Sequence, residues 1–188
     1  MIDSSLKTFF DNIDTYKQEK AERLTIVVQA SDEVSYGFDK DCDVDYCVNN
    51  NIPVYDRKGA GGTIVHAKGN IGVDYIYSHD KVRTFVSLDL LEDLAEYLKT
   101  KGLSVALTNN DILVDGYKVA SCAEDNLPPD FRWCHSAVQI SINQNLELIE
   151  KVCLKPMAKV PKGLGDYSIT TDEMLQFVCN WFNERGYA

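Results

Sequence analysis

The chain has 188 residues, and its 19 basic against 29 acidic residues give a formal net charge of -10. Hydrophobic residues make up 45% and charged residues 26%, which is typical of a globular protein and excludes a disordered or collagen-like chain. The negative charge repels phosphate backbones and anionic membranes, so we expect neither a nucleic-acid nor a membrane partner. No run of about 18 apolar residues occurs and the first twenty residues mix charges into their apolar positions, so we expect a cytoplasmic protein without a signal peptide.

The length predicts one domain, and no repeat or low-complexity linker divides the sequence. We therefore expect a single domain over residues 1–188. The sequence has no C-x-x-C motif and nothing that indicates an oxidising compartment, so we interpret its cysteines as reduced thiols rather than disulfides or zinc ligands. They are Cys42, Cys47, Cys122, Cys134, Cys153 and Cys179.

The first half of the chain alternates short helices and strands. Apolar residues at helical spacing, from Leu6 to Tyr16, predict an amphipathic helix behind a cap at Ser4 or Ser5. Asp43 caps a short helix that we expect to end near residue 51. Runs of apolar and β-branched residues predict strands at 24–30, 52–56, 62–66 and 71–77.

The second half contains the clearest helix and the clearest turn. Residues 87–102 predict a helix with Ser87 as its cap and Gly102 just past its end. Asp115-Gly116 between two strand-like runs predicts a hairpin. We also expect strands at 103–107 and 133–142 and helices at 145–153 and near the C-terminus. Helices among hairpin-joined strands predict an α+β fold with a mixed, mainly antiparallel sheet and flanking helices.

A glycine-rich stretch, Gly59-Ala60-Gly61-Gly62, is the first candidate for chemistry. Small residues leave backbone N–H groups uncovered and allow the chain to pass close to a ligand. The stretch matches neither a P-loop nor a dinucleotide-binding motif, so taken alone it is most simply a glycine-rich turn.

Two ordered strings change that interpretation. Residues 57–70 read RKGAGGTIVHAKGN, and residues 109–123 read NNDILVDGYKVASCA. In this order they resemble the lipoate-protein ligase, biotin ligase and lipoyl(octanoyl) transferase superfamily, and the resemblance extends over roughly residues 24–165. It implies a fold like that of class II aminoacyl-tRNA synthetases and biotin protein ligases.

The resemblance also implies a reaction. A lipoyl or medium-chain carboxylic acid, such as lipoate or octanoate, would attack the α-phosphate of ATP with Mg present, and the acyl adenylate would acylate a lysine of an acyl-carrier or lipoyl domain. Lys118 would be the catalytic residue, because a fixed cation between the carboxylate and the α-phosphate stabilises the charge of the transition state.

The residues that the resemblance assigns to binding share the two strings. The glycine amides would hold the adenylate, Arg57 would pair with phosphate or carboxylate oxygen, and Asn110 and Asp111 would serve the nucleotide or its magnesium. Simpler alternatives are a satisfied core histidine for His66, a turn cap for Asp111 and a solvated strand lysine for Lys118. The expected binding set is Arg57, Gly59, Gly61, Gly62, His66, Asn70, Asn110, Asp111 and Ser121.

Departures from the family pattern leave alternatives open. Ala60 interrupts the usual run of glycines, Ala67 stands where an aspartate is usual, and a small C-terminal accessory domain is not expected within the sequence. The chain would then work with an accessory chain, use a pre-formed adenylate, or bind its ligand without turnover.

A thioester-dependent acyltransferase is the alternative enzyme. It requires a nucleophilic cysteine, and Cys153 lies between Lys151 and Lys155, whose charges we expect to lower its pKa. Lys151, Lys155, Lys159 and Lys162 also form a basic stretch in an acidic protein. The stretch is a solvated face, part of the anionic cofactor site, or a docking site for an acidic carrier.

Overall fold

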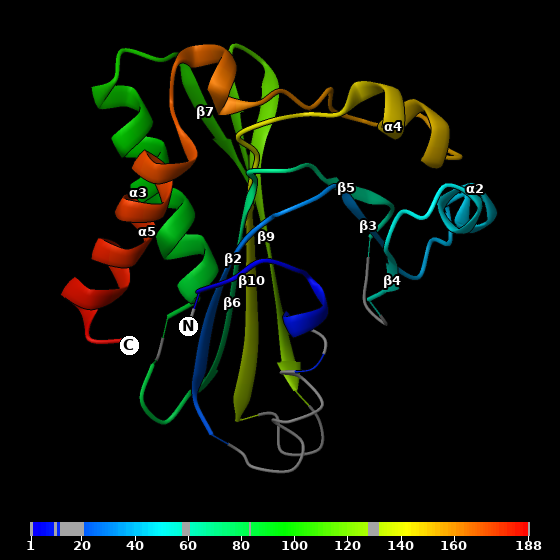
Figure 1. The fold of residues 1–188 in the computed structure, drawn as a ribbon. Coiled ribbons are helices and arrows are strands. Elements are labelled where there is room, and N and C mark those ends of the chain that lie inside the picture. The colour runs from blue at the N-terminus through cyan, green and yellow to red at the C-terminus, as the bar shows by residue number, and fades with distance from the viewer. Residues whose placement is uncertain are drawn as a thin grey trace.

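The structure is a computed structural model that describes residues 2–9, 11, 21–57, 61–82, 84–127 and 132–187. In these ranges the strands form a seven-stranded sheet, in the order β1-β2-β6-β10-β9-β8-β7, and a three-stranded sheet, in the order β4-β3-β5 (Figure 1). Neighbouring strands are antiparallel except for the pairs β1/β2 and β3/β4. The predicted α+β fold with a mainly antiparallel sheet is confirmed.

The large sheet consists of β1 (Ile2–Asp3), β2 (Arg23–Val28), β6 (Ile71–Ser78), β7 (Val105–Thr108), β8 (Asp111–Val114), β9 (Tyr117–Leu127) and β10 (Trp133–Ile140). The small sheet consists of β3 (Glu33–Tyr36), β4 (Val54–Asp56) and β5 (Ile64–His66). The helices are α2 (Val44–Asn49), α3 (Val86–Thr100), α4 (Leu146–Val152), α5 (Thr171–Arg185) and the 3-10 helix η1 (Leu164–Tyr167).

Helices α3 and α5 lie side by side against one face of the large sheet (Figure 1). Apolar residues at helical spacing in both helices pack on alternate residues of β6 and β10, so this face of the sheet is buried. Fully burying each of these side chains contributes about 1.5–3 kcal/mol. The core includes Leu90, Leu94, Leu98, Val178 and Phe182 from the helices, and Val73, Tyr75, Tyr77, Val138 and Ile140 from the strands.

The small sheet, α2 and α4 lie on the other side of the large sheet (Figure 1). They share a second apolar cluster, and both helices have a side-chain cap: Asp43 accepts the N–H of Tyr46, and Asn145 accepts that of Leu148. The cluster contains Val34, Cys47, Val65, Leu148, Ile149 and Val152. The two layers leave a cleft between the small sheet and the ends of β8, β9 and β10.

Most local predictions are confirmed, the cap at Ser87 is wrong, and strands β1 and β3 were not predicted. Asp115 and Gly116 have φ of 52° and 84°, so the hairpin turn adopts the left-handed conformations that this dipeptide favours. Ser87 is not a cap, because α3 begins at Val86 and the Ser87 hydroxyl donates to the carboxylate of Glu124 instead. Strand β3 was not predicted, since its sequence EVSY has few apolar residues.

Most of the predicted opening helix cannot be compared, because residues 10 and 12–20 lie outside the described residues. Within the described part, Leu6 is buried and Phe9 N–H donates to the Leu6 carbonyl, as in a helical turn. None of the described helices is long and apolar enough to cross a membrane.

Candidate functional site

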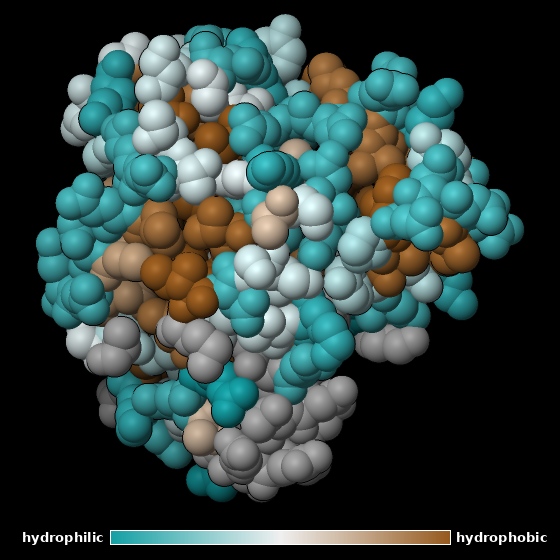
Figure 2. Space-filling view, viewed as in Figure 1, coloured by the Kyte–Doolittle hydropathy of each residue, from teal (hydrophilic) through white to brown (hydrophobic). Residues whose placement is uncertain are grey.

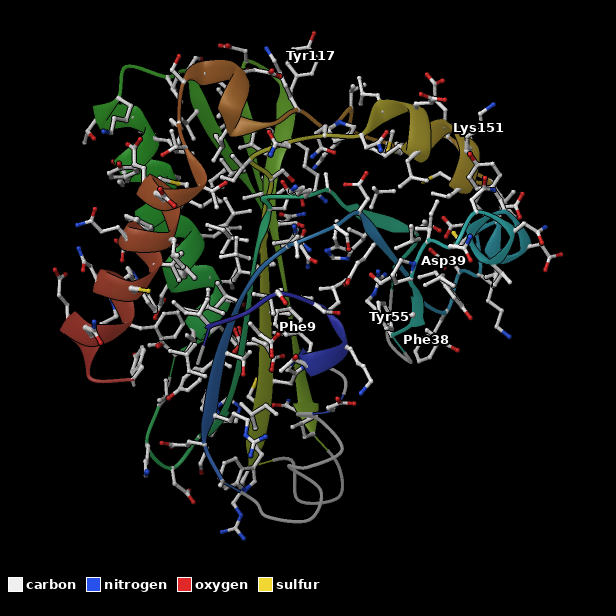
Figure 3. All side chains as sticks on the ribbon, in the orientation of Figure 1. Phe9, Phe38, Asp39, Tyr55, Tyr117 and Lys151 are labelled. Atoms are coloured by element: carbon white, nitrogen blue, oxygen red, sulfur yellow. The ribbon has the colours of Figure 1, made fainter. Side chains whose placement is uncertain are left out.

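A cleft of about 450 Å³ lies between the two sheets, within the size range of small-molecule sites. Its walls come from β5, β8, β9, β10 and α4, and from the segment that follows α4. Asp39 lies on its small-sheet side, and Tyr117 begins β9 on the other (Figure 3). Residues that line the cleft include Asp39, Asp41, Gly62, Thr63, Asp111, Lys118, Ser121, Gln139, Cys153, Lys155 and Lys159.

Two lysines in the cleft share one carboxylate. Lys118 Nζ lies 2.8 Å from Asp111 Oδ1, and Lys159 Nζ lies 2.5 Å from Asp111 Oδ2 and 3.0 Å from Thr108 Oγ1. Burial alone raises the pKa of Asp111, but the hydrogen bonds and charges of the two ammonium groups lower it below its usual value. Asp111 therefore stays ionised and holds both lysine side chains in place as ion-pair partners.

The backbone of Lys118 is hydrogen-bonded to the segment that follows α4. Lys118 N–H donates to the Val160 carbonyl, and Lys162 N–H donates to the Lys118 carbonyl, each at 2.9 Å. Gly163 follows, where a Cβ atom would lie 2.3 Å from the Ile142 carbonyl oxygen, so only glycine lets the segment approach this closely. The segment after α4 thus fixes the backbone of Lys118, although it is not part of the β8–β9 hairpin on which Lys118 lies.

The opposite wall is the glycine-containing segment before β5. A Cβ atom at Gly62 would lie 2.5 Å from Asp41 Oδ2, and Thr63 Oγ1 donates to Asp41 Oδ1 at 2.8 Å. Arg57 Nη2 donates to the Gly62 carbonyl at 2.6 Å. Gly61 has a φ of 92°, which favours glycine. Arg57 and Asp41 therefore hold this backbone segment, and the Asp41 carboxylate occupies the space where a side chain at Gly62 would lie.

His66 is a buried histidine that reaches the cleft through another residue. Its Nδ1 lies 2.9 Å from Gln139 Oε1, and its Nε2 lies 2.8 Å from Ser35 Oγ. Burial lowers the pKa of His66 to about 4, so the ring is neutral at pH 7. Gln139 lines the cleft, and we did not predict it, because a lone glutamine on a strand carries no motif.

The remaining predicted residues divide into two groups. Ser121 lines the cleft together with Gly62, Asp111 and Lys118. Asn70 Oδ1 accepts the backbone N–H groups of residues 142 and 143, each at 2.8 Å, and Asn110 Nδ2 donates to a β9 carbonyl. The asparagines bind backbone and do not line the cleft. Gly59 lies outside the described residues.

Cys153 lines the cleft at the end of α4, opposite Cys42 in an isolated antiparallel bridge. The expectation that Lys151 and Lys155 lower its pKa is wrong. Burial, and then the negative charge of Asp41, raise the pKa of the Cys153 thiol, which disfavours the nucleophilic thiolate. Within the described ranges, no three His, Cys, Asp or Glu side chains are grouped so as to hold a metal ion.

Comparison with known proteins shows the family. The sequence matches the Lipoyl protein ligase A/B catalytic domain over residues 9–176. The chain belongs to this family. The match confirms the resemblance that the two strings carry, and the chain is a lipoate-protein ligase-like catalytic domain. A search of curated protein sequences found no match.

Solved structures of this family and of biotin ligases share the fold. A bi-partite lipoate protein ligase from Thermoplasma acidophilum, studied with its E2 lipoyl domain, is 16% identical with a TM-score of 0.73, over 98% of this chain and 80% of that one. Lipoate-protein ligase A bound with ATP is 16% identical with a TM-score of 0.73, over 98% of this chain and 82% of that one. The biotin protein ligase from Aquifex aeolicus, in complex with biotin and ATP, is 13% identical with a TM-score of 0.54, over 97% of this chain and 66% of that one.

Proposed function

We propose that this chain activates a lipoyl or medium-chain carboxylate with ATP and transfers the acyl group to a lysine of a carrier protein. In the first step a carboxylate oxygen attacks the α-phosphorus and pyrophosphate leaves. In the second step the uncharged amine of the carrier lysine attacks the acyl carbon, AMP leaves, and the amine loses a proton. The product is an amide on the carrier.

The observation that carries this proposal is the placement of Lys118. Its ammonium lies in a ligand-sized cleft and is ion-paired with Asp111, and its backbone is fixed by the segment at residues 160–162. Negative charge on the reacting oxygens grows in the transition state, and a cation already held in position stabilises it without reorganisation. A lysine acts here as a compact point charge.

The cleft also suits a phosphate-bearing ligand. Lys118, Lys155 and Lys159 supply positive charge, and Gly62 lines the facing wall, where its backbone N–H would donate to a phosphate oxygen. Asp39 and Asp41 are the carboxylates nearest that wall, whereas each oxygen of Asp111 already faces a lysine. With no group of three metal-ligating side chains among the described residues, magnesium would take most of its ligands from the phosphates and water.

The acid and the carrier follow from the family. The matched family is named for lipoyl transfer, and the Thermoplasma relative was studied with an E2 lipoyl domain, so we infer lipoate or octanoate as the acid and a lipoyl or acyl-carrier domain as the acceptor. A single catalytic domain over residues 1–188, an accessory chain and a cytoplasmic location stay predictions.

Acid-dependent exchange of labelled pyrophosphate into ATP tests the first step. We expect exchange with lipoate or octanoate and magnesium, and none without the acid. A chain that binds the acid but gives no exchange would contradict adenylation and would support a binding module. Acyl transfer from a thioester donor without ATP would support the acyltransferase instead.

A further inference from the structure

Three side chains form a row across neighbouring strands on the cleft face of the large sheet. Gln139 of β10 is directly opposite Ser121 of β9, and Ser121 is directly opposite Asp111 of β8. All three line the cleft. Directly paired residues lie on the same face of a sheet, so the row leads from the lysine-bound carboxylate to Gln139.

A chain of hydrogen bonds fixes the orientation of the Gln139 amide. Arg57 Nη1 donates to Ser35 Oγ at 2.9 Å, so the hydroxyl is free to donate its proton to His66 Nε2, 2.8 Å away. The neutral ring then carries its proton on Nδ1, which donates to Gln139 Oε1 at 2.9 Å. The three contacts are consistent with one arrangement, in which the guanidinium donates to the hydroxyl, the hydroxyl donates to His66 Nε2, and His66 Nδ1 donates to Gln139 Oε1.

In this arrangement the side-chain N–H groups of Gln139 have no acceptor within the part of the chain that the structure describes. Oε1 is occupied by His66, and Nε2 is buried without a hydrogen-bond partner among the described residues. An unpaired buried donor is unfavourable, and a ligand oxygen that accepts from it removes that penalty. A glutamine that was free to rotate would present either its oxygen or its nitrogen, whereas this one presents only N–H groups.

Ser121 separates Gln139 from Asp111 and its two lysines in this row. The next residue in the row is Gly72 of β6, and a Cβ atom there would lie 2.8 Å from the Phe9 ring. Toward Gly72 the row is covered by the Phe9 ring and leaves the cleft, and toward Asp111 it meets the two lysines. A carboxylate head group bound in the cleft beside the lysines would lie within the part of the row that Gln139 and Ser121 line.

We propose that Gln139 is a substrate-binding residue whose side-chain N–H donates to a carboxylate oxygen of the acid, and that Arg57, Ser35 and His66 position it as a donor. The proposal rests on the proposed function for the identity of the acid. It adds a residue that contacts the acid and not the nucleotide.

Kinetics with two substitutions at Gln139 test the contact. Gln139→Leu removes the donor, and Gln139→Glu keeps the shape but offers only acceptors and adds a negative charge. We expect the KM for octanoate or lipoate to rise about tenfold in Gln139→Leu and further in Gln139→Glu, while the KM for ATP stays within about twofold. The matched control is Gln176→Leu on the exposed face of α5.

A double-mutant cycle tests the positioning role of His66. His66→Phe removes the ring N–H that holds Gln139 Oε1, so it should raise the KM for the acid on its own and add little in the Gln139→Leu background. Calorimetric titration of octanoate without ATP gives the same comparison independently of turnover. If the wild type binds the acid but shows no pyrophosphate exchange, the proposed function is contradicted, and the acid affinities of the Gln139 variants still test the contact. Equal acid affinity in the wild type and both Gln139 variants, or no acid binding by the wild type, would overturn this inference.

Discussion

Asp111 and Lys118 face each other across the β8–β9 hairpin, with 2.8 Å between Oδ1 and Nζ, and the second oxygen of Asp111 faces Lys159. One carboxylate thus orders two ammonium groups, which gives this part of the cleft a net positive charge. An anion that enters the cleft meets cations already held in position.

Replacing Lys118 should affect the chemical step more than folding. Lys118→Ala removes the cation that we place at the reacting oxygens, and we expect acid-dependent pyrophosphate exchange to fall by about 10²–10³. Asp111 keeps Lys159 as a partner, so the melting temperature should change little. Lys99→Ala, on the exposed side of α3, is the control. Exchange at the wild-type rate in Lys118→Ala would exclude the assigned role.

Stability should fall in acid because of His66. Its pKa of about 4 in the folded protein lies below the ordinary value of 6.5, so between these values the unfolded chain binds more protons than the folded one. The stabilisation is complete above about pH 6.5 and is lost as the pH falls toward 4; the full shift corresponds to roughly 3 kcal/mol. Urea unfolding at pH 7 and pH 4 should show a smaller loss for His66→Gln than for the wild type. Equal losses would contradict the assigned burial.

Steric crowding at Gly62 predicts a coupled pair. Gly62→Ala places a methyl group against Asp41 Oδ2, and we expect a destabilisation of about 1–3 kcal/mol together with weaker exchange. The same change should cost less in an Asp41→Ala background, where the space is open. The free energies of unfolding of the four proteins give the coupling. Additive effects would show that the two residues do not touch.

Cys153 should be dispensable. Burial and Asp41 raise the pKa of its thiol, so we expect Cys153→Ser to keep acyl transfer to the carrier within about twofold. Intact mass after incubation with an acyl thioester should show no covalent adduct. An adduct that disappears in Cys153→Ser, together with lost activity, would favour the acyltransferase.

The basic stretch from Lys151, in the last turn of α4, to Lys162 should contribute to carrier docking. It holds four lysines without an acidic residue, and Leu154, Met157 and Val160 are exposed between them. Figure 2 shows apolar surface interspersed with hydrophilic surface on this side of the molecule, and Figure 3 shows Lys151 on α4. An acidic carrier domain would complement this surface, because opposite charges steer association.

Charge reversal at Lys151, which does not line the cleft, isolates docking from chemistry. Lys151→Glu should raise the KM for an acidic apo lipoyl domain about threefold or more and weaken its dependence on salt, while pyrophosphate exchange is unchanged. Lys99→Glu is the matched control. An unchanged KM for the domain would show that it docks elsewhere.

Local patterns predicted much of the fold and part of the site. The resemblance carried by the two strings grouped Gly62, Asp111, Lys118 and Ser121, and all four line one cleft in the structure. The role of Arg57 could not be predicted, because its partners Ser35 and Gly62 depend on how β3 pairs with β5.

Gln139 is the clearest omission. It lies outside both strings, on the strand that follows β9, and the register of β10 against β9 and β6 brings it beside Ser121 and Gly72. Its contact with His66 also crosses between the two sheets. Strand register and contacts between two sheets cannot be derived from a local motif, so a residue placed by them is not predicted from the sequence.

The central claim is the formation of an acyl adenylate, and native mass spectrometry tests it most directly. The protein is incubated with ATP, magnesium and lipoate, octanoate or biotin in turn, and native and denaturing spectra are recorded side by side. The account predicts an added mass equal to one acyl adenylate in the native spectrum with lipoate or octanoate, absent after denaturation and absent in Lys118→Ala. Native spectra that show only the unmodified chain with every acid would contradict it.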